Sequence, residues 1–386
     1  MDGLRAVSIL LVISVHMRDR VWGWLEGRLG VTIFFVISGY LITTLSLREE
    51  RLRGSLHLRS FFVRRAFRLL PLYYVVLLAY CALILGLGWS PEKRGALVGS
   101  LPYYLLYFQE WPLFMGIHGK FQNIPFTQTW SLGVEEKFYF VWAFLGFVAW
   151  RKAGALRLWG TVGLSAALIL FSAAVERRLS LFLYPHSHIL IGCVLALLLD
   201  DPTWFGRLAW LRHRFPGWLI LAAFLALQLT MPSLASPGER YFQSVYAVIV
   251  ALFLAVILLG EGPIQRLLRR PSLVSIGKLS YGMYLVQLMA IRGAECLVPP
   301  GSGFFLVSAM ALLLACLLSI ASAHLLAVVI ERRGIGIGRR FSNALLKGTT
   351  PAHSSQAVGR SRHEGYGNSS RGAPVTSESR QTSSSG

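Results

Sequence analysis

The stretch GVTIFFVISGYLITTLSL, residues 30–47, decides the fold, because it contains no charged side chain. An α-helix rises about 1.5 Å per residue, so a stretch of this length can cross the roughly 30 Å hydrocarbon core of a bilayer. Similar apolar stretches recur along the chain and predict about ten transmembrane helices in an all-α integral membrane protein. They lie near residues 4–17, 30–47, 69–88, 133–150, 158–175, 184–199, 217–232, 243–260, 280–298 and 304–330.

The composition agrees with a membrane protein. Only 15% of the 386 residues are charged and 54% are hydrophobic, whereas soluble domains carry about a quarter charged residues. The net charge of +20 would suggest nucleic acid in a soluble protein. Here Lys and Arg collect in short loops between apolar stretches, and we expect no nucleic-acid partner. The four cysteines lie far apart without a CxxC pair, so we expect neither a disulfide framework nor a metal site.

Loop charge predicts the orientation. With a cytoplasmic N-terminus, the loops on the inner side carry a net charge of +16 and those on the outer side +3. This asymmetry follows the positive-inside rule and predicts that both termini are cytoplasmic, in the inner (plasma) membrane of a cell. We expect residues 1–333 to form one membrane domain. Residues 334–386 are basic and rich in Ser and Gly, which predicts a mostly disordered cytoplasmic tail.

Arg5 and His16 lie in the first predicted span, separated only by apolar or small residues. Eleven helical steps make about three turns, so the two side chains share a face, roughly 16 Å apart along the axis. An ionisable residue in a span is costly and indicates function. For His16, the alternative is that it simply ends the helix at the outer interface.

Glu135 and Glu136 lie in TQTWSLGVEEKFYF, residues 127–140, at the outer start of the fourth predicted span. A helix N-terminus favours negative charge, which offers a purely structural explanation. We expect Glu135 at the same depth as His16. A carboxylate there would orient the imidazole and raise its basicity, as a general base requires.

Arg64, Arg65 and Arg68 lie at the predicted cytoplasmic mouth of the third span. Taken alone, such a cluster is more typical of contacts with lipid phosphates. The alternative is that it holds the phosphates of a cytosolic, nucleotide-like donor, because a guanidinium binds phosphate through two parallel hydrogen bonds.

Other polar residues interrupt the apolar stretches. Ser38 and Gly39 are small, which favours close helix packing as their role. Gln287 lies inside the ninth predicted span. Arg292 and Glu295 are three residues apart on the same helix, and we expect them to neutralise one another.

Five motifs, taken in order, resemble the acyltransferase-3 family of bacterial integral-membrane acyltransferases. This family includes O-antigen and other surface-polysaccharide O-acetylases. The resemblance covers roughly residues 2–331. It rests on DGLRA followed by His16, FFVISGYLI, RRAFRLLPLYY, WSLGVEEKFYF and SYGMYLVQ.

The resemblance implies an acyl-CoA co-substrate, often acetyl-CoA, no permanently bound cofactor, and transfer to a carbohydrate hydroxyl. It implies that Arg5 and His16 are essential, that His16 is the base, and that the arginines of the 64–68 stretch help the donor. Glu135 matches the family's acidic position. Family members commonly have His where this chain has Gln287, and an amide can hydrogen-bond but cannot titrate near neutral pH.

These inferences together predict a membrane acyltransferase in residues 1–333, with His16, Arg5 and Glu135 as catalytic residues. The expected partners are membrane lipids, a carbohydrate or glycolipid acceptor, and polysaccharide-biosynthesis proteins of a bacterial cell envelope. Two alternatives stay open: acylation of a small secondary metabolite, and a transporter or flippase for a lipid-linked glycan. Candidate acceptor or structural residues are Trp130, Ser131, Tyr139, Ser38, Tyr284 and Gln287.

Overall fold

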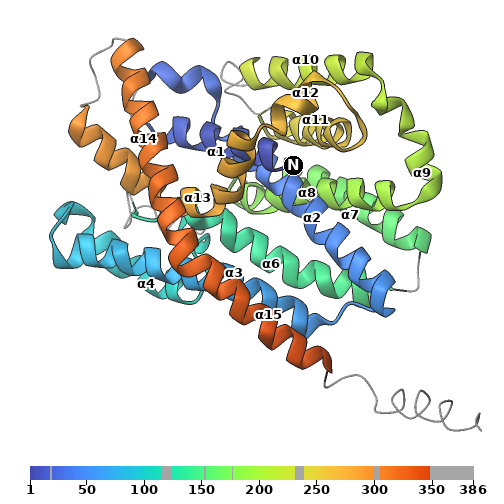
Figure 1. Ribbon diagram of the computed structural model, residues 1–386, viewed down its shortest axis with the longest axis horizontal. Coiled ribbons are helices and arrows are strands. Elements are labelled where there is room, and N and C mark those ends of the chain that lie inside the picture. Colours follow the sequence, from blue (N-terminus) through green and yellow to red (C-terminus); the bar gives the residue numbers. More distant parts are fainter. Residues whose placement is uncertain are drawn as a thin grey trace, which may run out of the picture.

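The computed structural model describes residues 1–17, 20–114, 124–151, 154–175, 177–230, 239–298 and 305–347. All the regular elements in these ranges are helical, which confirms the all-α prediction for the described residues (Figure 1). The α-helices are α1 (Asp2–His16), α2 (Leu29–Arg53), α3 (Leu58–Cys81), α4 (Arg94–Leu105), α5 (Trp111–Phe114), α6 (Trp130–Phe144), α7 (Gly154–Ala174), α8 (Arg177–Asp200), α9 (Pro202–Arg207), α10 (Arg214–Thr230), α11 (Glu239–Leu259), α12 (Pro263–Leu268), α13 (Pro271–Leu297), α14 (Phe305–Leu326) and α15 (Arg332–Lys347). Short 3₁₀ or π segments are η1 (Arg20–Leu25), η2 (Ala82–Gly86), η3 (Pro91–Lys93), η5 (Thr127–Thr129), η6 (Leu145–Ala149), η7 (Ala209–Arg212) and η9 (Ala327–Glu331).

The chain is a multi-pass membrane protein. Among the described residues, 7 helices are long and apolar enough to cross a bilayer. They are Val21–Arg53, Leu58–Gly86, Gly154–Ala174, Phe182–Asp200, Phe242–Leu259, Pro271–Leu297 and Phe305–Leu346. The other three predicted spans correspond to α1 and α10, which are shorter, and to α6 with η6, which contains Glu135, Glu136 and Lys137. The count of ten and the cytoplasmic placement of both ends stay predictions.

α14, η9 and α15 form one continuous helix, Phe305–Leu346, that runs diagonally across the molecule (Figure 1). Its last part lies against α3, where a Cβ added at Gly334 would come within 2.4 Å of the Phe67 carbonyl oxygen. The expected division at residue 333 therefore falls inside this helix. Gly334 and Gly338 have no side chain, so the backbones of α15 and α3 can approach closely. Residues 334–347 belong to the helix bundle, and residues 348–386 lie outside the described ranges.

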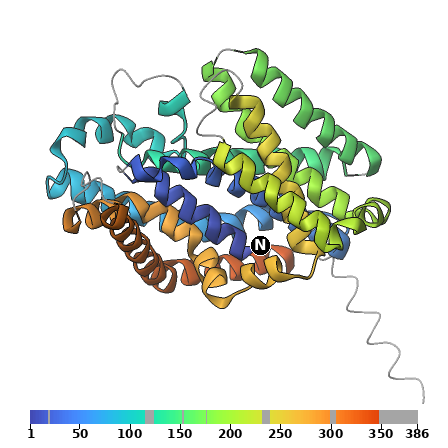
Figure 2. The ribbon, with the colours of Figure 1, turned by 90° about the horizontal axis from the view of Figure 1, so that it is seen from above.

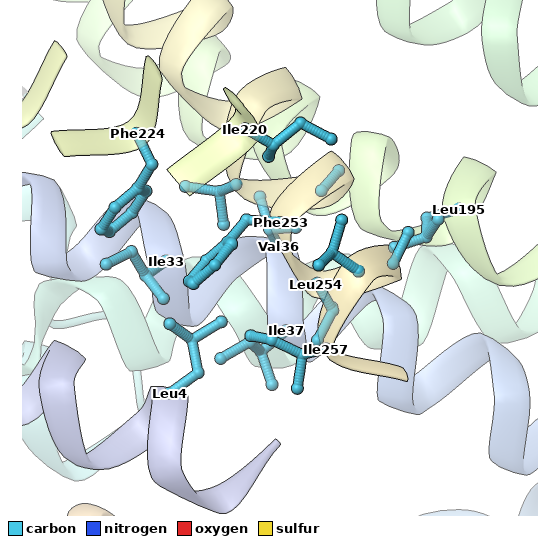
Figure 3. Close-up of a cluster of buried hydrophobic side chains, with 14 of the residues drawn as sticks. Leu4, Ile33, Val36, Ile37, Leu195, Ile220, Phe224, Phe253, Leu254 and Ile257 are labelled. Carbon is cyan, nitrogen blue, oxygen red and sulfur yellow. The ribbon is translucent and has the colours of Figure 1, made fainter. Parts of the chain in front are cut away.

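A buried apolar cluster joins α1, α2, α8, α10 and α11 (Figure 3). Leu4, Val36, Leu195, Phe224 and Leu254 contribute to it, and each is at most 5% exposed. Lipid tails are as apolar as these side chains, so the hydrophobic effect does not drive the helices together within the bilayer. Close van der Waals packing holds them together instead.

The closest approach between α2 and α8 is reciprocal. A Cβ on Gly39 would lie 1.8 Å from the Ile189 carbonyl oxygen, and one on Gly192 would lie 2.1 Å from that of Val36. Only glycine fits at either position. The packing role predicted for Gly39 is therefore confirmed.

α1 lies within the helix array, and two perpendicular views place its N-terminal end near the middle of the molecule (Figures 1 and 2). It runs parallel to α13: a Cβ on Gly277 would meet the Asp2 carbonyl oxygen at 1.9 Å, while His16 and Ile291 line the same cavity. The Ser8 hydroxyl also donates a 2.5 Å hydrogen bond to the Gly30 carbonyl of α2. α1 is thus fixed by neighbours at its N-terminal end and at its middle.

Replacing Gly39 with Ala tests the α2–α8 contact. The added methyl has to displace backbone, so we expect the free energy of unfolding to fall by about 1–3 kcal/mol. Gly163 of α7 is the matched control, because it is exposed and nothing lies within 4 Å of an added Cβ. Thermal unfolding in detergent should show a lower midpoint for Gly39→Ala and an equal or higher one for Gly163→Ala. Equal midpoints for the two variants would contradict the packing described.

Candidate functional site

A cavity of about 830 Å³ opens between α1, α2, α3, α6, α13 and α15. We call it the cationic cavity, because arginines outnumber acidic residues in its lining. Its volume lies within the range of roughly 300–1,000 Å³ that is usual for small-molecule and cofactor sites. Its charged residues are Arg5, Arg48, Arg53, Arg64, Arg65, Arg68, Arg339, Asp2, Glu49 and Glu135.

Arg64 is held by protein groups on three helices. Its guanidinium pairs with Glu49 of α2 at 2.5 Å and donates to the Ser342 hydroxyl of α15 at 3.0 Å. It also donates to Ser60, one turn earlier on α3, at 2.5 Å. Arg64 therefore ties α2, α3 and α15 together, and its hydrogen-bonding capacity is largely used.

Arg65 is engaged in a similar way. It donates a 2.9 Å hydrogen bond to Glu136 of α6, and its guanidinium lies 3.8 Å from the centroid of the Tyr139 ring. This ion pair and cation–π contact join α3 to α6. The structure thus gives Glu136 a partner on a neighbouring helix, beyond the helix-terminus role considered from the sequence.

Arg68 and Arg5 differ from these two arginines. Both line the cationic cavity. Within the part of the chain that the structure describes, neither guanidinium forms a hydrogen bond or an ion pair. Their donors remain available for an anionic ligand, which is the property that a phosphate site requires.

Polar side chains of α2, α6 and α13 lie together in the lining of the cationic cavity. Glu135 accepts hydrogen bonds from Ser38 at 3.1 Å and from Tyr139 at 3.2 Å. Ser131 and Tyr284 share a 2.8 Å hydrogen bond between their hydroxyls. The sequence-based expectation of a packing role for Ser38 is therefore incomplete, because its hydroxyl holds a carboxylate.

Of the six candidate acceptor residues, four line this cavity: Ser38, Ser131, Tyr139 and Tyr284. Trp130 packs against Phe35, with ring centroids 6.0 Å apart, and Gln287 lies deeper in the bundle.

His16 lines a second, smaller cavity of about 170 Å³, which we call the His16 cavity. Its Nδ1 lies 2.7 Å from the Val12 carbonyl oxygen. A carbonyl only accepts hydrogen bonds, so Nδ1 carries the proton, and in the neutral ring Nε2 keeps its lone pair. Arg292 and Glu295 also line this cavity and pair at 3.5 Å, which confirms their predicted pairing.

The predicted contact between Glu135 and His16 is wrong. Glu135 lines the cationic cavity with Arg5, and the residues at the depth of His16 are Ile124, Pro125 and Phe126. The polar stretch before α6 begins at that depth, and the chain then runs inward for more than two helical turns before Glu135. The Val12 carbonyl takes the orienting role that was expected of the carboxylate.

Gln287 lies between the two cavities. Ser280 and Tyr284 on α13 line the cationic cavity, and Ile291 lines the His16 cavity. Spacings of four, three and four residues place Ser280, Tyr284, Gln287 and Ile291 on one face of the helix. Gln287 is fully buried, and neither atom of its amide has a hydrogen-bond partner among the described residues.

Sequence reasoning missed several residues of the cationic cavity. Tyr281 donates a 2.8 Å hydrogen bond to the Leu69 carbonyl of α3, and Glu49 pairs with Arg64. Arg339 and Ser342 were assigned to the tail. The one available signal was helical spacing, since Gly334 and Gly338 lie one turn apart and can share a face.

Comparisons with known proteins give a consistent result. A family model described as an acyltransferase domain matches residues 1–327. The peptidoglycan O-acetyltransferase OatA of Listeria monocytogenes is 36% identical over 170 residues, covering 42% of this chain and 26% of that protein. The putative peptidoglycan O-acetyltransferase YrhL of Bacillus subtilis is 28% identical over 366 residues, covering 89% and 56%. A putative O-acetyltransferase of Staphylococcus aureus is 28% identical over 312 residues, covering 75% and 50%.

The chain spans about half of the length of two of these relatives and about a quarter of the third. No solved structure matches it.

The paired and unpaired arginines of α3 should respond differently to substitution. Arg65→Leu leaves Glu136 without its partner, so we expect a loss of about 1–3 kcal/mol of stability. Arg68→Leu breaks no such contact and should stay within about 0.5 kcal/mol of the unaltered protein. Thermal unfolding in detergent measures both variants, and equal losses would contradict this division of the cluster.

Proposed function

The chain belongs to the acyltransferase family whose domain matches residues 1–327, and from this we propose that it is a membrane O-acyltransferase. In this proposal it moves an acyl group from acyl-CoA to a hydroxyl of a cell-surface or lipid-linked carbohydrate. The names of the relatives support acetyl as the group and an envelope glycan as the acceptor. The multi-pass helices support a site inside the membrane.

One observation carries the proposal: α1 connects two cavities of different chemistry. Arg5, in its first turns, lines the cationic cavity, and His16, at its end, lines the His16 cavity. A donor with a polyphosphate end suits unpaired arginines. A hydroxyl acceptor needs a base with a free lone pair, which Nε2 of His16 can supply.

The reaction then proceeds as follows. Acyl-CoA enters the cationic cavity with its phosphates near Arg68 and Arg5, and its thioester reaches along α1 towards His16. Nε2 of His16 takes the proton of the acceptor hydroxyl, and the hydroxyl oxygen attacks the thioester carbonyl carbon. The C–S bond breaks, the new ester leaves with the acceptor, and the imidazolium proton passes to the CoA thiolate.

Gln287 has a defined part in this mechanism. α1 and α13 run parallel, with Asp2 beside Gly277 and His16 near Ile291. Gln287 therefore lies near the level of Val12, which is one turn, or roughly 6 Å along the helix axis, from the level of His16. Its unpaired amide N–H can donate a hydrogen bond to the carbonyl oxygen as negative charge develops there, which lowers the barrier.

His16→Ala should reduce acyl transfer by about 10²–10⁴-fold, because the reaction loses its general base. His324→Ala is the matched control, since His324 is an exposed residue of α14. Mass spectrometry of surface polysaccharide and of metabolite extracts, from cells with and without each variant, measures the transfer and identifies the acceptor.

Full transfer by a folded His16→Ala variant would overturn the base assignment. An acylated small metabolite in place of a glycan would favour the metabolite alternative. A glycan that crosses the membrane without chemical change would favour the transporter.

Gln287→Leu separates a catalytic role from a structural one. Leu fills a similar volume and removes an unpaired buried amide, so stability should stay equal or rise. We expect kcat to fall by about 10²–10³-fold, with little change in KM for acyl-CoA. Steady-state kinetics and thermal unfolding on the same preparation test this. Unchanged kcat with a lower unfolding midpoint would assign Gln287 to structure alone.

A further inference from the structure

α15 lies beyond the part of the chain that matches the acyltransferase family, which ends at residue 327. Even so, Ile335, Arg339, Ser342, Asn343 and Leu346 of this helix line the cationic cavity. A segment assigned to the tail on its composition therefore forms a wall of the candidate active site. The question is whether this wall only encloses the cavity or also binds the ligand.

The position of α15 is fixed by contacts along its length. Gly338 packs on Phe67, where an added Cβ would lie 2.6 Å from the Phe67 Cβ. The rings of Phe67 and Phe341 stack with centroids 5.5 Å apart. Ser342 is buried and shares a 2.5 Å hydrogen bond with Ser60. A helix held by packing, stacking and hydrogen bonds can present a side chain to the cavity in a defined place.

The length of the helix places α15 outside the hydrocarbon. Phe305–Leu346 has 42 residues and extends for roughly 63 Å, about twice the thickness of the apolar core. If α14 spans the bilayer, α15 lies in the headgroup layer or beyond it. It carries Arg332, Arg333, Arg339, Arg340 and Lys347 and no acidic residue, so we expect it on the cytoplasmic side. This is the side from which a soluble donor arrives.

Arg339 has the properties of a ligand-binding group. Arg64 and Arg65 are engaged with Glu49 and Glu136. In the described ranges Arg339, like Arg68, forms neither a hydrogen bond nor an ion pair. The cavity thus has one arginine on α15 and another on α3 that are both free to bind an anion. Two guanidinium groups on separate helices suit a ligand with more than one phosphate.

We infer that α15 is part of the donor site and that Arg339, with Arg68, binds the phosphate-bearing end of the acyl donor. This inference rests on the proposed function, because it takes acyl-CoA as the donor. It adds a specificity determinant that lies outside the family-matched domain. The apolar residues Ile335 and Leu346 form the adjoining wall, against which the less polar part of the donor can lie.

The test compares two adjacent arginines. Both side chains are exposed, but Arg339 lines the cavity and its neighbour Arg340 does not. Binding of coenzyme A to the full-length protein in detergent is measured by calorimetry for Arg339→Gln, Arg340→Gln and the unaltered protein. Arg339→Gln should weaken binding about ten- to hundredfold, the usual loss for a charge-assisted hydrogen bond. Arg340→Gln should bind as the unaltered protein does.

The other outcomes are distinguishable. If the unaltered protein binds coenzyme A and Arg339→Gln binds it equally well, the inference fails and the proposed function stands. If the unaltered protein does not bind coenzyme A at all, the proposed donor itself is wrong. Arg339→Lys provides a second variant that keeps the charge but not the planar fork, and it should show an intermediate affinity.

A lipid headgroup carries the same phosphate chemistry, and the bilayer composition separates the two sources. The measurement is repeated in nanodiscs of phosphatidylcholine alone and of phosphatidylcholine mixed with phosphatidylglycerol. Binding of coenzyme A that depends on Arg339 in both nanodiscs supports the donor. If phosphatidylglycerol abolishes coenzyme A binding to the unaltered protein, the arginines hold lipid and the inference is overturned.

Discussion

The parallel contact between α1 and α13 is the constraint on which the site depends. The carbonyl oxygen of Asp2 occupies the space that a side chain at Gly277 would need, and the Leu268 carbonyl of α12 does the same at Gly3. Apolar helices gain little free energy by leaving lipid for one another, so such close backbone packing has to hold them together. This packing places Arg5 at one cavity and His16 at the other, with Gln287 along the wall between them. A wider spacing would separate the two ends of the proposed reaction path.

The arginines show how one cluster can serve structure and ligand binding together. Arg64 and Arg65 are neutralised by acids on neighbouring helices, so they fix the positions of α2, α3, α6 and α15. Arg68 and Arg339 line the same cavity without such partners in the described ranges. An unpaired guanidinium at a membrane protein's cavity is costly unless it meets water or an anion. The paired arginines thus hold the walls in place, and the unpaired ones are left for the donor.

The helical fold and many of the helix positions along the chain could be predicted, because long apolar stretches leave few alternatives to membrane helices. The packing of Gly39 followed from its small size, and the pairing of Arg292 with Glu295 followed from their spacing on one helix. The depth of Glu135 in the bundle could not be predicted, because hydropathy does not show how the polar residues before α6 fold. Contacts between residues far apart in the sequence, such as Arg65 with Glu136, could not be predicted either. α15 was mistaken for tail because its composition is basic and glycine-rich, and only its packing on α3 shows that it belongs to the bundle.

The central claim is that two cavities joined by α1 serve one transfer reaction, with the donor in the cationic cavity. An electron cryo-microscopy structure of the full-length protein with bound coenzyme A tests this most directly. The account predicts the phosphates within hydrogen-bond distance of Arg68, and the thiol pointing along α1 towards Gln287 and His16. Coenzyme A in the His16 cavity, or bound outside both cavities, would contradict it.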